Sequence, residues 1–242
     1  MRLALAYAVD KDRLVSEVLK GEGRKIDSPI TPQLLGYNPD TKIYNFDKEY
    51  AKTLLDQALW VDADGDGIRE KDGAKLNFGL VANNWTDIAT TANLLQGMWK
   101  EIGADAQIQI TDNIKQDYIK TRAYQAILFG EILNYDPDPF SFWHSSQKKD
   151  PGLNLSLYDN PNADKLLEDA RKETDQNVRA QKYQEFQNLV IEDIPAIFLY
   201  SPDYLYIQDN SIQGVEARNI ITPSDRFNGA AEWYLRTTRI VK

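Results

Sequence analysis

Apolar residues recur at helical spacing in several stretches of this chain. In the first of them, Leu3, Tyr7 and Leu14 fall on one helical face, and glycines at 21 and 23 end the pattern. Asp47 precedes another such face and can cap a helix. The predicted helices cover residues 2–20, 48–58, 86–102, 112–122, 164–172 and 178–193.

Other stretches carry the pattern of strands. Residues 76–81 and 106–110 alternate apolar and polar side chains, as half-buried strands do. Short apolar runs predict buried strands at 126–129 and 196–200, and 204–207 is expected to lie beside the latter. Because helices and strands alternate along most of the chain, the predicted fold class is α/β.

Two stretches follow neither period. Residues 27–41 contain three prolines and read as an ordered loop. Residues 210–242 read as loop with short strands, and the regular alternation stops near 200–210. A boundary is therefore expected there.

The composition of the chain argues against several classes of protein. The chain has 242 residues, 42 % of them hydrophobic, and no run approaches the ~20 apolar residues of a membrane helix. The charged residues at 10–13 break the apolar start, so no signal peptide is expected within the chain. Because the chain has no cysteine, thiolate catalysis and zinc–thiolate sites are excluded. The net charge of -9 disfavours nucleic acid as a partner.

The stretch VDADGDGIREKDG (61–73) resembles the start of a calcium loop. Alternating carboxylates, a glycine and a following carbonyl supply oxygens of the kind that calcium prefers. The position that should hold a bidentate glutamate is Gly73, and a strand rather than a helix is predicted to follow. A plain acidic turn is the alternative. The possible calcium ligands are Asp62, Asp64, Asp66, the carbonyl of Ile68, and Glu70.

The sequence offers little support for an enzyme. His144 is the single histidine, and no nucleophile or nucleotide-binding motif accompanies it. Its neighbours suggest a packed or hydrogen-bonded ring. We therefore expect no catalytic site and no required cofactor, apart from a possible structural calcium.

The stretch GEILNYDPDPFSFWH (130–144) follows a predicted buried strand. It therefore leaves the sheet at a strand's carboxyl end, where open α/β sheets bind ligands. Asp136 and Asp138 each precede a proline, which keeps them extended. Acids beside aromatic residues suit a ligand with an ammonium group and apolar side chains. A rigid loop whose aromatic side chains belong to the core is the alternative.

The order of these motifs resembles the family 5 extracellular solute-binding proteins, the peptide-binding components of ABC importers. RLALAYAVDKDRLVSEVLKGEG is similar to the helix that opens the second lobe of that family. Further similarities are the acidic turn, LLQGMWKEIGADAQIQITD, NYDPDPFSFWHSSQ, and the helical stretch that ends in IPAIFLY. The resemblance implies the second lobe of a two-lobed, type II periplasmic-binding-protein fold over 1–207. It also implies that 208–242 returns toward the hinge and a first lobe.

The resemblance further implies a function and a site. The expected activity is capture of a peptide or other small solute outside the cytoplasmic membrane and its delivery to an ABC permease. The protein would be a monomer, either periplasmic or lipid-anchored. Peptide-binding relatives place an aspartate where this chain has Asn134, so a salt bridge to the peptide amine would be either absent here or moved to Asp136. The expected ligand contacts are Asn134, Tyr135, Asp136, Asp138 and, as a residue that could instead fix a turn, Asn154. Another small solute, such as an oligosaccharide, is the first alternative, and a hydrolase is the second.

Overall fold

The computed structural model describes residues 1–134, 136–216, 220 and 222–235. Its helices are α1 (Arg2–Tyr7), α2 (Lys11–Val18), α3 (Lys48–Gln57), α4 (Thr86–Lys100), α5 (Phe140–Trp143), α6 (Pro161–Lys172) and α7 (Gln176–Asp193). Its strands are β1 (Gly23–Lys25), β2 (Glu70–Lys71), β3 (Ala74–Lys75), β4 (Asn77–Asn83), β5 (Asp105–Thr111), β6 (Ala126–Ile127), β7 (Tyr200–Pro202), β8 (Ile212–Gln213) and β9 (Tyr234–Leu235). Single helical turns are η1 (Lys115–Ile119), η2 (Ser145–Gln147), η3 (Pro223–Phe227) and η4 (Ala230–Glu232).

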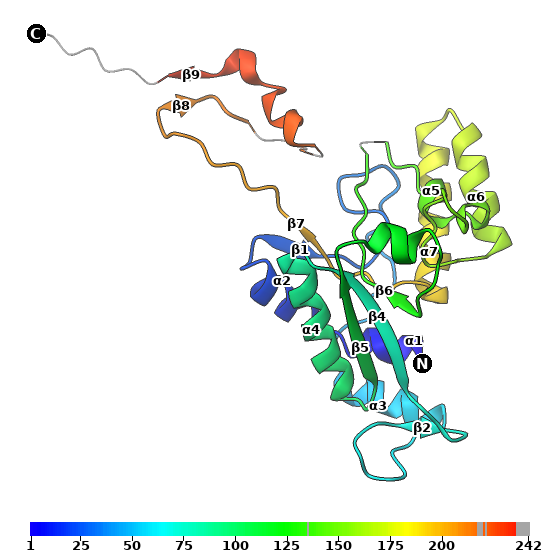
Figure 1. Ribbon diagram of the computed structural model, residues 1–242. Coiled ribbons are helices and arrows are strands. Elements are labelled where there is room, and N and C mark those ends of the chain that lie inside the picture. Colours follow the sequence, from blue (N-terminus) through cyan, green and yellow to red (C-terminus); the bar gives the residue numbers. More distant parts are fainter. Residues whose placement is uncertain (135, 217–219, 221, 236–242) are drawn as a thin grey trace, which may run out of the picture.

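A three-stranded parallel sheet of order β5-β4-β6 lies at the centre of the fold (Figure 1). Helix α4 connects β4 to β5 and packs against the sheet, so this unit is a βαβ crossover. The predicted α/β class is thereby confirmed. The first hydrophobic core lies around this unit and α1 to α3, and it includes Leu14, Leu55, Leu80, Leu95 and Trp99.

The predicted helix over residues 2–20 is two helices, α1 and α2. Asp10 breaks it, because its carboxylate accepts a hydrogen bond from the backbone N–H of Arg13 at 2.9 Å and so caps a new helix. The apolar spacing continues across this break, which is why periodicity alone missed it.

A second core forms where α5 and the antiparallel pair α6 and α7 meet. Helices α6 and α7 begin three and two residues earlier than predicted, because Asn160 and Asp175 cap them through their side chains. The buried members of this core are Ile30, Trp143, Tyr158, Ala163, Leu167, Ala170, Tyr183, Phe186 and Val190. This core positions the residues that follow β6.

The predicted strands at 196–200 and 204–207 are wrong. Residues 196–199 belong to no strand, and only β7 joins a ladder, antiparallel to β1. Ala196 and Phe198 pack on the second core, whereas Ile197 and Leu199 pack on the first. The apolar run therefore bridges two cores instead of lying inside one sheet.

Two shorter predictions also need correction. Over 112–122 the structure has only the π-helical turn η1, which suits the buried Ile114 and Ile119 because they are five residues apart. The strand predicted at 126–129 is limited to β6, an edge strand, and Phe129 is 48 % exposed. Pairing on one side only explains why this strand is short and half-buried.

The C-terminal stretch extends away from the α/β body (Figure 1). Strands β8 and β9 pair with each other, with Ile212 opposite Leu235. Within the described ranges, no helix combines the length and hydropathy required to cross a membrane.

Candidate functional site

The carboxyl edge of the parallel sheet carries the stretch predicted to meet a ligand, residues 130–144, hereafter the Asp-Pro segment. Strand β6 pairs with β4 up to Ile127, and the Leu128 N–H donates to the Val81 carbonyl at 2.8 Å. The chain then leaves the sheet near the end of β4. Trp85, which starts α4 at the same edge, is 71 % exposed. The sequence reasoning missed this tryptophan, although its place between a predicted strand and a predicted helix was a usable signal.

Asp138 is bound by an arginine of α6. Arg171 donates through Nε to both Asp138 carboxylate oxygens at 3.0 Å and through an Nη atom to one of them at 2.5 Å. Its guanidinium also lies over the ring of Phe140, 3.8 Å from the centroid. Asp138 therefore ties the segment to α6 with a forked, charge-assisted contact.

Asp136 is bound by an arginine of α7. The two Nη atoms of Arg179 lie 2.9 and 2.7 Å from the Asp136 oxygens, and one of them donates to the Tyr183 hydroxyl at 3.0 Å. Burial raises the pKa of that hydroxyl above its usual range. Both arginines lie on helices that the sequence predicted, but helical periodicity contains no information about a partner in a distant loop.

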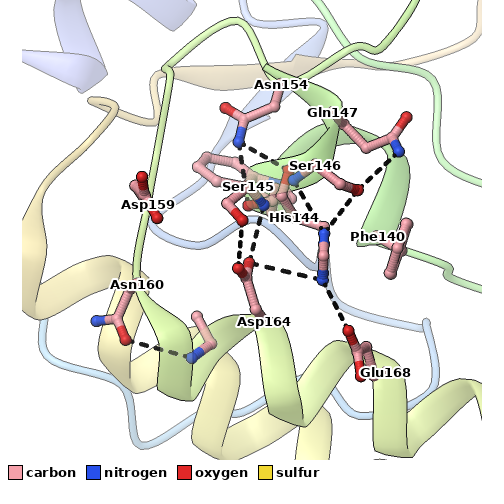
Figure 2. Close-up of polar contacts among 12 residues, drawn as sticks. Phe140, His144, Ser145, Ser146, Gln147, Asn154, Asp159, Asn160, Asp164 and Glu168 are labelled. Atoms are coloured by element: carbon pink, nitrogen blue, oxygen red, sulfur yellow. Dashed lines mark hydrogen bonds and ion pairs between the residues drawn. The ribbon is translucent and has the colours of Figure 1, made fainter. Parts of the chain in front are cut away.

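His144, the last residue of the segment, belongs to a packed polar cluster (Figure 2). Its side chain is 9 % exposed, and its ring stacks on Phe140 with centroids 4.1 Å apart. Its Nδ1 lies 2.8 Å from the Ser146 hydroxyl, and its Nε2 lies 3.3 Å from a Glu168 oxygen. The expectation of a packed, hydrogen-bonded histidine is confirmed.

Asn154 is fully buried and fixes the turn that follows α5 (Figure 2). Its amide nitrogen donates to the carbonyls of Trp143, His144 and Tyr158 at 2.9–3.2 Å. Its Oδ1 accepts from the Ser156 hydroxyl and the Tyr158 N–H, both at 3.1 Å. All polar atoms of this side chain are used within the loop, which supports the turn-fixing role and leaves none to meet a solute.

The remaining candidates differ in their exposure. Asn134 is exposed, whereas Tyr135 lies outside the described residues. The aromatic side chains that end the segment belong to the second core, with Trp143 only 3 % exposed and Phe140 and Phe142 packed beside it. These aromatic side chains therefore follow the alternative stated above, in which they belong to the hydrophobic core and do not contact a ligand.

Glu131 is an acid that the sequence reasoning did not select. It is exposed and follows β6 by four residues. Although the residue reaches solvent, the surrounding protein desolvates its carboxyl group and raises the pKa to about 7.

The acidic turn closes between Val61 and Glu70, which form a β-bridge ahead of the β2–β3 hairpin. Carboxylate oxygens of Asp62, Asp64 and Glu70 lie within 4.8 Å of one another. Lys75 contacts the carboxylates of Asp64 and Asp66, and its hydrogen bond lowers the pKa of Asp66. Three of the predicted calcium ligands, Asp62, Asp64 and Glu70, are thus close together, and Lys75 contacts one of them, Asp64, as well as Asp66 outside that group.

Calcium binding by this turn stays a prediction. If the turn binds calcium, a concentration about 100-fold above the dissociation constant should raise the melting temperature by roughly 5 °C or more. Asp64→Ala should abolish that shift, and Asp112→Asn, which replaces an exposed acid outside the turn, should preserve it. The measurement is thermal unfolding with calcium and with EDTA. The same melting temperature in both conditions would contradict calcium binding and support the plain acidic turn.

Comparisons with known proteins were made once this geometry was established. The family model described as bacterial extracellular solute-binding proteins, family 5 Middle, matches residues 1–154. Oligopeptide-binding protein AppA of Bacillus subtilis is 32 % identical over 241 residues, which is 97 % of this chain and 44 % of AppA. The probable D,D-dipeptide-binding periplasmic protein DdpA of Escherichia coli is 28 % identical over 223 residues, 88 % of this chain and 40 % of DdpA.

Solved structures agree with these matches. AppA in complex with a nonapeptide superposes with a TM-score of 0.79 at 30 % identity, covering 98 % of this chain and 47 % of AppA. NikZ of Campylobacter jejuni in complex with Ni(L-His) gives 0.78 at 26 % identity, covering 96 % of this chain and 48 % of NikZ. The chain spans less than half the length of each of these relatives.

Proposed function

Because the chain belongs to the bacterial extracellular solute-binding proteins of family 5, we propose that it captures a peptide-like solute and delivers it to an ABC permease. The observation that carries the proposal is the likeness over nearly the whole chain to AppA, whose structure holds a nonapeptide. The fold is one lobe of the two-lobed type II architecture. A peptide-binding role agrees with the Asp-Pro segment at the carboxyl edge of the sheet.

The proposed site is the face of this lobe formed by the Asp-Pro segment and the ends of β4 and β6. Backbone groups of the segment, the Asn134 side chain and Tyr135 are the proposed contacts of an extended ligand. Residues 1–207 would form the second lobe, and 208–242 would return toward a first lobe that completes the cleft. Binding would then close the two lobes over the ligand.

The protein would act without covalent chemistry, as the transport components of this family do. Family members are extracellular or periplasmic, so we propose an extracytoplasmic location, either free or lipid-anchored, and a monomeric state. The permease is the proposed macromolecular partner.

A second candidate is a binder of another small solute. NikZ, which is 26 % identical and of almost equal structural similarity, holds nickel with histidine and not a longer peptide. The same lobe can therefore serve ligands of different chemistry, and an oligosaccharide is one such class.

The test is isothermal titration calorimetry of the full-length protein against panels of peptides, nickel–histidine and oligosaccharides. We expect binding of peptides of several lengths with dissociation constants in the range of about 1 μM or below. Mass spectrometry of the ligand that copurifies provides an independent check. Binding of oligosaccharide or metal chelate alone, with no peptide bound, would contradict the proposal.

A further inference from the structure

Trp85 is an exposed aromatic residue at the carboxyl edge of the parallel sheet. It follows β4, the central strand, by two residues and directly precedes α4. The residue is 71 % exposed, whereas the other four tryptophans of the chain are buried or half-buried. Covering an indole removes a large apolar surface from water, so an uncovered one at this edge can contribute strongly to binding.

The backbone of Trp85 is held from both sides. Its N–H donates to the Asn83 side-chain oxygen at 3.0 Å, and its carbonyl accepts from the Ala89 N–H of α4 at 2.8 Å. Helix α4 is anchored in the first core through Leu95 and Trp99, which are 2 % and 5 % exposed. The indole is therefore carried on a fixed backbone, and a ligand that packs on it has to order only two side-chain torsions.

Phe129 brings a second exposed ring to the same edge. Strand β6 pairs with β4 up to Ile127 opposite Val81, and Phe129 lies two residues beyond that pair. It is 48 % exposed. Neither Trp85 nor Phe129 belongs to a hydrophobic core of the described chain. Two aromatic residues thus follow neighbouring strands at one edge of the sheet without a packing role inside the lobe.

The likeness to AppA indicates what would cover these rings. The AppA structure holds a nonapeptide, and an extended peptide presents a side chain at every residue. Backbone hydrogen bonds to such a ligand do not distinguish one side chain from another, so selectivity depends on the surfaces that the side chains meet. An indole favours an aromatic partner, because rings gain free energy from offset or edge-to-face contact in addition to burial.

We propose that Trp85, together with Phe129, is a specificity-determining residue that selects peptides with an aromatic side chain at one fixed position. The inference rests on the proposed function and goes beyond it by naming the class of peptide that the protein prefers. The fixed backbone of Trp85 ties the preference to one position of the peptide.

The experiment uses a nonapeptide of alanine and serine as host and nine derivatives, each with one phenylalanine at a different position. Calorimetry on the full-length protein gives a dissociation constant for each peptide. We expect one position at which phenylalanine tightens binding about tenfold over the host peptide. Trp85→Ala should abolish this gain and change the affinity for the host peptide by less than about twofold. Trp85→Tyr should retain a gain of roughly threefold, because the smaller ring keeps part of the contact surface.

Leu59→Ala is the matched control. Leu59 is 69 % exposed and follows α3, which lies at the end of the sheet opposite to Trp85 (Figure 1). This variant should keep the phenylalanine gain of the wild-type protein at the same position of the peptide. A tryptophan emission that shifts to shorter wavelength with the preferred peptide, and less so in Trp85→Tyr, provides an independent readout.

Three results would overturn the assignment. They are a wild-type protein without any positional gain for phenylalanine, a gain that Trp85→Ala leaves intact, and an equal weakening of host and phenylalanine peptides by Trp85→Ala. The last would show that the indole contacts the other lobe or the peptide backbone instead of a side chain. Absence of peptide binding by the folded wild-type protein would contradict the proposed function, and this inference with it. Melting temperatures identify any variant that fails to fold.

Discussion

Replacing Phe186 by alanine should lower the free energy of unfolding by about 3–5 kcal/mol. The side chain has no exposed surface and lies in the second core, with its ring 6.3 Å from that of Trp143. Helices on either side hold the surrounding side chains, so the cavity would collapse only in part. Urea unfolding followed by tryptophan fluorescence measures the change, and Trp143 reports on this core.

Val178→Ala is the matched control, because Val178 lies on the same helix, α7, and is 37 % exposed. Its effect should stay within about 1 kcal/mol. If Phe186→Ala cost no more than this control, the second core would not be the close-packed support of the Asp-Pro segment that we describe.

Replacing Asn154 by alanine should cost about 2–4 kcal/mol. The substitution removes five hydrogen bonds of a fully buried side chain and leaves three carbonyls and the Tyr158 N–H without this partner. Each buried polar group that loses its partner costs free energy, although water entering the space can recover part of it. Peptide affinity should fall as well, because the turn supports the end of the Asp-Pro segment.

The control is Asn162→Ala, since Asn162 is exposed on the first turn of α6. It should change the free energy of unfolding by no more than about 0.5 kcal/mol. A direct ligand contact by Asn154 predicts a different result, namely lost affinity with unchanged stability in urea unfolding.

The hydrophobic pattern by itself determined the elements of the central βαβ unit and the helix that precedes it. The spacing at 48–58 and 86–102 predicted α3 and α4, and the alternation at 76–81 and 106–110 predicted β4 and β5. Local signals suffice there because a helix or a strand buries one face, and its period is written into consecutive residues. The order of motifs also resembled a family, which the family match confirms.

The hydrophobic pattern gave a wrong prediction where one stretch of chain packs against two different cores. Residues 196–199 look like a buried strand because they alternate between two cores, and a periodicity argument cannot distinguish the two cases. The break at Asp10 was hidden for a related reason, since the same apolar face continues on both sides of the cap.

The roles of the acids in the Asp-Pro segment were decided only by the tertiary structure. The sequence presented Asp136 and Asp138 as equivalent carboxylates near aromatic residues, and it gave no reason to select Glu131. Folding brings Arg171 and Arg179 to the two aspartates from 33 and 43 positions away, and leaves Glu131 at the sheet edge without such a partner. An ion pair depends on where two side chains meet in space, and no local period records a contact between residues so far apart in the chain.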